Sequence, residues 1–273
     1  MFGMLKENTV NQLKLLALAG CLGLWGCASM DTPNTSSAQI PKEEASFEDK
    51  SKARDKFKDG LQFLSLNMLK EAIGSIQDAA RLDPHNSAYP LYIGAIHYSE
   101  GNLDAAESVF LEVLEMDSDN KDAYRKLGRL YLEQGRWSQA AHYLEEDLKR
   151  PGTPMPHTVY NWLALSYYNL KRFDEAERQW LLALDIAENA DIRYNLGLAF
   201  KFNEKFDKAL ESFELAARMK PEFAPAHFES ALLYLKKQNF TQARRHFESV
   251  VRLEATGERS DMSREYLNLI SSQ

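Results

Sequence analysis

The sequence predicts an all-α protein, a solenoid of about six paired helices closed by a C-terminal capping helix. Small residues recur at intervals of 33 to 36 positions between residues 60 and 231. An alanine follows each of them twelve positions later, and a large apolar residue lies four positions beyond that alanine. This period indicates repeated helix pairs, each packed on its neighbours in a row.

Small residues let the two helices of a pair approach closely, and we expect the large residues to fill the gap between neighbouring pairs. The first small residues are Gly60, Gly94, Gly128, Ala164, Gly197 and Ala231. The alanines are Ala72, Ala106, Ala140, Ala176, Ala209 and Ala243. The large residues are Ile76, Phe110, Leu144, Trp180, Phe213 and Phe247.

Composition excludes several classes of protein. The 273 residues are 44% hydrophobic, which is enough to bury a core, and the net charge of -7 gives no basic field for nucleic acid. Both cysteines lie within the first 27 residues. A disulfide scaffold, a zinc site with several thiolates and a cysteine nucleophile are therefore excluded for the repeats.

Residues 1–26 form a predicted targeting segment. Lys6 and Lys14 supply positive charge, and residues 15 to 26 carry none, although this stretch is too short to span a bilayer. Its end, Gly26-Cys27, resembles a bacterial lipoprotein signal, which implies that Cys27 is acylated. Cys21, which follows Leu18-Ala19-Gly20, is an alternative site. An ordinary signal peptide with an incidental cysteine and an N-terminal membrane helix also remain open.

The segment after the signal is predicted to tether the repeats to the membrane. Residues 27–52 begin with Cys27 and are rich in Ser, Thr, Pro, Lys and Glu, a composition typical of a flexible chain. In the lipoprotein class, Ala28 in place of an aspartate favours the outer membrane of a Gram-negative host. The resemblance thus implies an outer-membrane lipoprotein that faces the periplasm.

Residues 53–257 resemble the tetratricopeptide repeat, which implies a right-handed superhelical solenoid. The six repeats are expected at 53–86, 87–120, 121–154, 157–190, 190–223 and 224–257. Residues 258–273 are expected to cap the last repeat, since Met262, Tyr266, Leu269 and Ile270 have helical spacing. The extra residues 151–156 predict a wider loop.

Polar residues are expected to cap the second helix in five repeats. These residues are Asp104, Ser138, Asp174, Asp207 and Thr241.

Catalytic and metal-binding motifs are not found in the sequence: it has no H-E-x-x-H pair, phosphate-binding glycine loop or nucleophile elbow. We therefore predict no enzyme activity, no cofactor, no metal and no small-molecule substrate.

The family resemblance implies a concave groove built by the first helix of each repeat, with its second, fifth, ninth and twelfth positions facing a protein partner. The predicted groove residues are Tyr98, Arg125, Arg129, Asn161, Leu165, Tyr168, Tyr194, Leu198, Phe228 and Leu232. We expect Asn161 to hydrogen-bond the backbone of the ligand, and Arg125 and Arg129 to pair with a carboxylate. The aromatic side chains would anchor apolar groups.

A lipid-anchored chain made almost wholly of such repeats resembles the PilF/PilW-type pilotins of type IV pilus biogenesis. The residues that carry this resemblance lie at 152–154, 160–168 and 266–270. It implies capture of an unassembled secretin subunit. One alternative is a general envelope scaffold that recruits peptidoglycan enzymes or aids outer-membrane protein assembly. Another is an accessory subunit of an enzyme complex.

Overall fold

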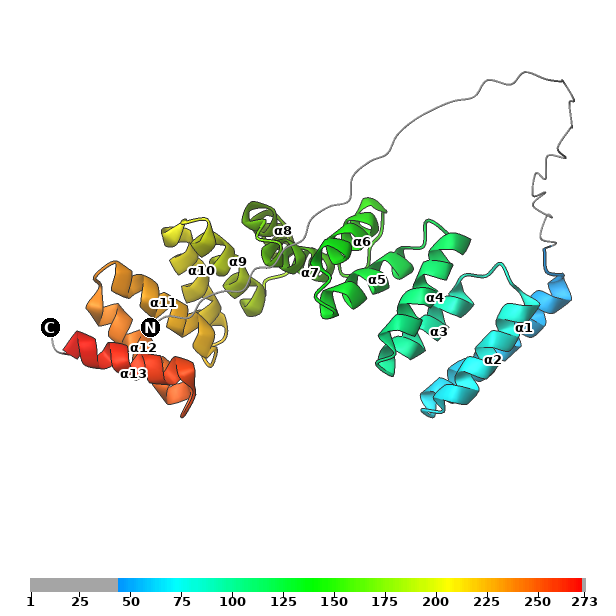
Figure 1. Cartoon of the computed structure of the whole chain (residues 1–273), viewed down its shortest axis with the longest axis horizontal. Helices are drawn as coiled ribbons and strands as arrows, with labels where there is room; N and C mark the ends of the chain where they lie inside the picture. Colours follow the sequence, from blue (N-terminus) through cyan, green and yellow to red (C-terminus); the bar gives the residue numbers. More distant parts are fainter. Residues whose placement is uncertain (1–43, 272–273) are drawn as a thin grey trace, which may run out of the picture. The chain divides into compact units, whose positions relative to one another are not determined.

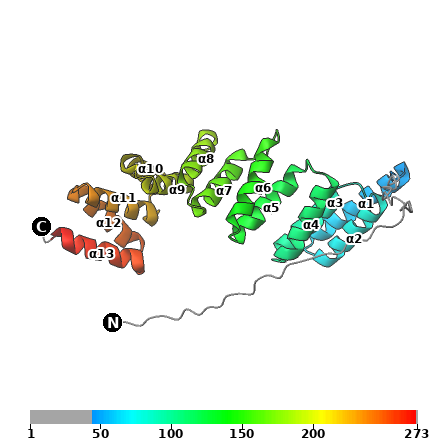
Figure 2. The ribbon, with the colours of Figure 1, turned by 45° about the horizontal axis from the view of Figure 1, so that its top comes forward.

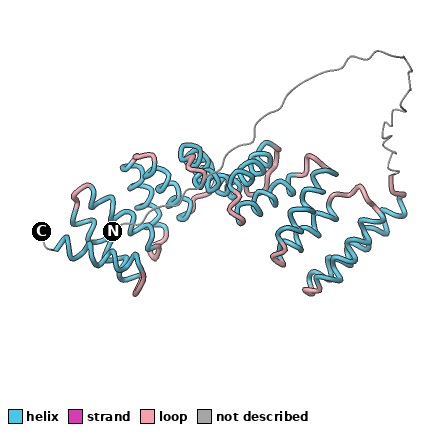
Figure 3. The backbone as a smooth tube through the Cα atoms, viewed as in Figure 1, coloured by secondary structure: helices cyan, strands magenta, loops and turns pink. Residues whose placement is uncertain are grey.

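The computed structural model describes residues 44–271, and these residues contain thirteen α-helices and no strand (Figures 1 and 3). The first helices of the six pairs are α1 (Phe47–Ser65), α3 (Ala88–Ser99), α5 (Lys121–Glu133), α7 (Pro156–Asn169), α9 (Ala190–Phe202) and α11 (Ala224–Lys236). The second helices are α2 (Leu69–Leu82), α4 (Leu103–Met116), α6 (Trp137–Lys149), α8 (Phe173–Ile186), α10 (Phe206–Met219) and α12 (Phe240–Leu253). The last helix, α13 (Glu258–Ser271), packs against α12.

Each helix pairs with its partner and then with the next pair along the chain, so the described part of the chain is an all-α solenoid (Figure 2). The buried side chains accordingly form successive clusters rather than one central core. One cluster joins α1 to α3, a second joins α3 to α6, a third extends from α6 to α11, and a fourth joins α11 to α13. This arrangement confirms the predicted fold class.

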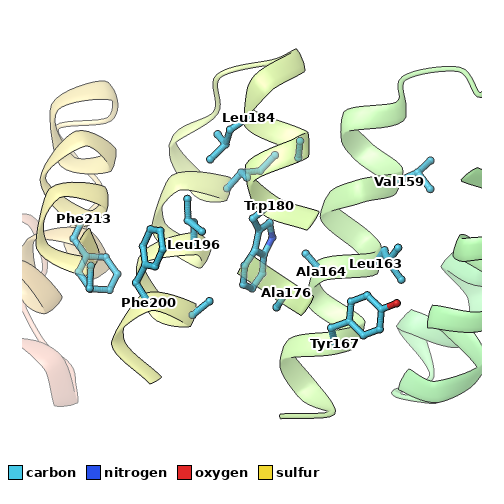
Figure 4. Packing of buried hydrophobic residues seen from close by; sticks show 14 of the residues in the cluster. Val159, Leu163, Ala164, Tyr167, Ala176, Trp180, Leu184, Leu196, Phe200 and Phe213 are labelled. Atoms are coloured by element: carbon cyan, nitrogen blue, oxygen red, sulfur yellow. The ribbon is translucent and has the colours of Figure 1, made fainter. Parts of the chain in front are cut away.

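The large apolar residues lie inside the pairs, on the small residue of their own repeat, rather than only between pairs as expected. A Cβ atom added at Gly94 would lie 2.6 Å from Cε1 of Phe110, and one at Gly197 would lie 2.5 Å from Cε1 of Phe213. Figure 4 shows the equivalent Trp180, which is 1% exposed, packed with Ala164. The small residue is required because the large side chain occupies the space of its Cβ.

The predicted caps of the second helices are corrected by the structure. Each second helix begins one residue before the polar side chain, at a large apolar residue such as Leu103 or Phe206, so Asp104 and Asp207 lie in the first turn. There they stabilise the helix by interacting with the positive end of its dipole, but they do not serve as the N-cap. Among the six N-cap residues only Asn239 makes a side-chain cap, to the amide of Gln242 at 3.2 Å.

The reason is the turn inside each pair, which closes the first helix by a Schellman motif. One residue adopts a positive φ, and the amide after it bonds back to a carbonyl five residues earlier, as from Arg136 to Tyr131 at 2.8 Å. The positive-φ residues are Asn67, Gly101, Gly135, Lys171, Glu204 and Gln238. This tight connection starts the second helix before the chain reaches the expected cap.

Residues 47–52, which are predicted to belong to the tether, instead form the start of α1. Ser46 caps this helix by accepting the amide of Asp49 at 3.1 Å, and Lys52 pairs with Glu48 one turn away at 2.6 Å. Acidic residues in the first turn also suit the helix dipole. The signal segment 1–26, Cys21, Cys27 and residues 28–43 lie outside the described residues.

The extra residues after α6 form the longest connection between two pairs, as predicted, and side chains of α5 hold it. The Lys121 ammonium donates to the carbonyls of Pro151 at 2.7 Å and Gly152 at 3.2 Å. The guanidinium of Arg150 lies 4.1 Å from the ring centre of Tyr124. The connection is therefore fixed on the preceding pair.

Candidate functional site

The predicted binding residues share one surface of α3, α5, α7, α9 and α11, here called the first-helix face. Of the ten predicted residues, nine are half-buried and Arg129 is exposed. Half-burial suits a binding surface, because the packed base of each side chain fixes the part that a partner can reach.

Arg129 joins the first three helices of this face. Its guanidinium lies 5.3 Å from the ring centre of Tyr98 on α3 and 5.7 Å from that of Trp162 on α7. Its Nε donates to Glu133 at 3.1 Å, and the Tyr98 hydroxyl donates to the same carboxylate. Arg129 is therefore held by the chain's own groups, and its charge is shared with Glu133.

Arg125 is less completely satisfied. It pairs with Asp122 one turn away, but its Nη1 is buried and has no hydrogen-bond partner within the described residues. The neighbouring Lys126 makes no ion pair there either. Burial, together with repulsion from Arg125 and Arg129, lowers the pKa of Lys126. These groups line a cavity of about 300 Å³ with Leu91, Tyr92, Ala95 and Asp122.

Asn161 was predicted to contact a ligand backbone, and the structure places its carbonyl oxygen 2.9 Å from the indole Nε1 of Trp180. The bond satisfies the polar edge of a side chain that is 1% exposed. Only the amide NH₂ of Asn161, which makes no hydrogen bond within the described residues, is left for a partner.

Tyr168 lies in an aromatic group that reaches the surface. Its ring centre is 5.4 Å from that of Phe173 and 5.6 Å from that of Phe202, and Phe202 is 54% exposed. The Tyr168 hydroxyl makes no hydrogen bond within the described residues. Burial, followed by the charge of Glu229, raises the pKa of Tyr168. The ring therefore remains neutral and offers an apolar surface beside a free hydroxyl.

Glu229 on α11 connects the remaining helices of the face. It accepts a hydrogen bond from Lys201 of α9 at 2.6 Å. Burial and then the Glu229 charge raise the pKa of Tyr194 to about 12, while Arg259 acts in the opposite direction. Glu229 thus lies within electrostatic reach of both Tyr168 and Tyr194.

A cavity of about 650 Å³ lies where α9, α11 and α13 meet. Tyr194, Phe228 and Met262 occupy equivalent positions in its wall, each 34 residues after the last. The other lining residues are Pro225, Glu229, Glu254, Ala255, Thr256, Gly257, Glu258 and Arg259. The last helix therefore helps to build the first-helix face in addition to covering α12.

Leu165, Leu198 and Leu232 pack partly into the buried clusters beneath the face. The face also contains residues that the sequence prediction missed: Tyr92, Lys126, Trp162, Glu229 and Met262. All but Met262 directly follow a fifth-position residue, and they lie four residues after the second position. That spacing places them on the same side of a helix.

The described residues contain no group of three or more His, Cys, Asp or Glu side chains placed to hold a metal ion. None of the helices within residues 44–271 is both long and apolar enough to cross a membrane.

One family model described as tetratricopeptide repeat matches residues 60–121, 125–192 and 194–258, and a second model of the same description matches residues 97–152. DnaJ homolog subfamily C member 7 of Mus musculus is 28% identical over 179 residues, which cover 60% of this chain and 35% of the relative. The BBSome complex member BBS4 homolog of Drosophila melanogaster is 24% identical over 58% of this chain and 36% of its own. The chain thus spans about a third of the length of these curated relatives.

Solved structures show the same architecture. The pilF protein of Pseudomonas aeruginosa superposes with a TM-score of 0.65 at 17% identity, covering 80% of this chain and 99% of that one. YrrB, a repeat protein with an unusual peptide-binding site, gives 0.64 at 17% identity over 70% of this chain and 97% of its own. MamA gives 0.56 at 25% identity over 60% and 95%. The first two likenesses concern the fold alone.

Proposed function

The chain belongs to the tetratricopeptide-repeat family, whose members bind protein partners, and from this premise we propose that it is a pilotin-like outer-membrane lipoprotein. In this proposal Cys27 carries the acyl chains, the repeats face the periplasm, and the first-helix face holds an unassembled secretin subunit until the secretin assembles. The protein acts by binding and catalyses no reaction.

The observation that carries the proposal is the row of half-buried aromatic residues Tyr168, Tyr194 and Phe228 on successive first helices. Tyr194 and Phe228 open into the 650 Å³ cavity, and Tyr168 adjoins the exposed Phe202. Partly open aromatic side chains beside a cavity are typical anchors of protein interfaces. Such a surface would cover an apolar segment that aggregates when it is left in water.

The test replaces Tyr168→Ala together with Phe228→Ala in the host and measures secretin multimers in isolated membranes. We expect multimers to fall about tenfold, since loss of a central aromatic anchor commonly costs 2 kcal/mol or more of binding free energy. The matched control is Leu181→Ala with Leu182→Ala, which removes side chains of 44% and 45% exposure from the second helix α8. Unchanged multimers in the first variant would refute the role of this face.

The anchor is tested separately by labelling with radioactive palmitate. Cys27→Ala should lose the label and leave the membrane fraction, whereas Cys21→Ala should keep both. A third experiment captures the proteins that bind the wild-type chain. Recovery of a peptidoglycan hydrolase in place of secretin would favour an envelope scaffold.

A further inference from the structure

The two cavities of the first-helix face carry opposite charge. The cavity between α3 and α5 is lined by Arg125 and Lys126 against one carboxylate, Asp122. At the other end, the cavity between α9, α11 and α13 is lined by three carboxylates against Arg259. The carboxylates are Glu229, which pairs with Lys201, Glu254, which pairs with Arg259, and Glu258, which makes no ion pair within the described residues.

Each end contains charge that the chain does not itself neutralise. Lys126 and Glu258 make no ion pair within the described residues, and Arg125 keeps a buried Nη1 without a hydrogen-bond partner. Arg125 also pairs with Asp122 and lies within electrostatic reach of the buried Asp147, so Lys126 is the cation that an incoming carboxylate would pair with at this end. At the acidic end, the rings of Tyr194 and Phe228 add faces that attract a cation.

The surface between the cavities is almost neutral. Asn161, Trp162, Leu165 and Tyr168 of α7 carry no charge, and Arg129 is neutralised by Glu133. The face therefore has a basic end, an apolar and aromatic middle and an acidic end. Electrostatic complementarity of this kind fixes the register and orientation of a bound segment more than it raises affinity.

We infer that the first-helix face binds an extended protein segment of segregated charge in one orientation, with acidic residues in the α3–α5 cavity, apolar residues over α7 and basic residues in the α9–α11–α13 cavity. The inference rests on the proposed use of this face for partner binding, but not on the identity of the partner. With neighbouring helices about 8–10 Å apart and about 3.3 Å per extended residue, a segment of about 12 residues would reach both cavities.

The test uses the purified full-length chain in detergent and fluorescent peptides of about 12 residues with blocked termini. One peptide has Asp and Glu at one end, Leu and Phe in the middle, and Lys and Arg at the other end. A second has the same composition with its charges alternating. Binding is followed by fluorescence anisotropy. We expect the segregated peptide to bind about tenfold more tightly, with a difference that shrinks in high salt.

Two charge reversals assign the ends. Lys126→Glu and Glu258→Lys break no ion pair in the described residues, and each should weaken the segregated peptide about tenfold. The Lys126→Glu variant should instead prefer a peptide with basic residues at both ends. The Glu258→Lys variant should prefer a peptide with acidic residues at both ends. The matched controls are Lys70→Glu on α2 and Glu112→Lys on α4, two exposed residues of second helices.

Equal binding of the segregated and alternating peptides, no binding up to about 1 mM, or reversals that behave like their controls would each overturn the inference. These outcomes are independent of secretin. If secretin multimers depend on Tyr168 and Phe228 but the two peptides bind equally, the proposed function holds and the charge-directed orientation is wrong. If the segregated peptide binds more tightly but the multimers are unaffected, the charge-directed orientation holds and the proposed function is wrong.

Discussion

The turns inside the helix pairs repeat one backbone motif, whereas the junctions between the pairs are held by side chains that vary along the chain. Every internal turn uses one positive-φ residue and a backbone hydrogen bond that closes the first helix. The junctions rely on side chains. Glu107 of α4 accepts from Arg136 and Tyr131, and Glu177 of α8, at the equivalent position of its repeat, accepts from Lys205 and Asn203. The geometry of a pair is thus set by the backbone and one small-to-large contact, and the relation between pairs is adjusted by polar side chains.

The largest effect should come from emptying the interior of one pair. Phe213→Ala removes a fully buried ring that lies on Gly197, and we expect the free energy of unfolding to fall by about 3–5 kcal/mol. Because each repeat contacts only its neighbours, the loss should be concentrated near α9 and α10. Urea unfolding and hydrogen exchange measure the two effects. Exchange that rises equally in α1 and α10 would contradict this local view.

The repeat architecture could be predicted because it depends on spacing. Gly94 and Phe110 are 16 residues apart, and so are Gly197 and Phe213, so the same contact recurs wherever the spacing recurs. The caps could not be predicted in this way. A positive φ is adopted at Lys171, a residue type that gives no sign of it, and the resulting turn moves the start of the next helix.

The residues of the first-helix face are predictable in part. Fifth-position residues such as Tyr194 and Phe228 line a cavity, as their register indicates. Met262 has the same register, 34 residues after Phe228, but it lies beyond the last recognisable repeat, where its helical spacing predicts only a cap. Glu229 is not predicted because its hydrogen bond from α9 and its electrostatic influence on α7 depend on how the pairs stack, and the repeat spacing does not determine that stacking.

The stability that a junction contributes should depend on pH, whereas the stability that a pair interior contributes should not. Burial opposes ionisation of Glu107, but the hydrogen bonds from Arg136 and Tyr131 outweigh it and hold the pKa of Glu107 below its usual value. Since the folded-state pKa is lowered, this stabilisation is present above the unfolded pKa, near 4.3, and is lost as pH falls below it.

Glu107→Gln therefore should lower the free energy of unfolding by about 1 kcal/mol at pH 7, a value limited by solvent screening of this partly open group. The difference from wild type should disappear between about pH 5 and pH 3, where Glu107 becomes protonated in both states. Urea titrations across this range measure it. A difference that stays constant with pH would mean that the ionised bond contributes nothing at this junction.

The smallest expected effect tests the internal turns and has the opposite sign. Glu204 holds φ at 56°, a conformation that a side chain destabilises and glycine adopts freely. Glu204→Gly should therefore raise the free energy of unfolding by about 0.5–1 kcal/mol, less than the full strain because glycine also gains freedom in the unfolded chain. Glu204→Ala removes the same charge without relieving the backbone, so it should give no gain. If both variants stabilised the protein equally, the charge of Glu204 and not its φ would be the cause, and the turns would differ from one another after all.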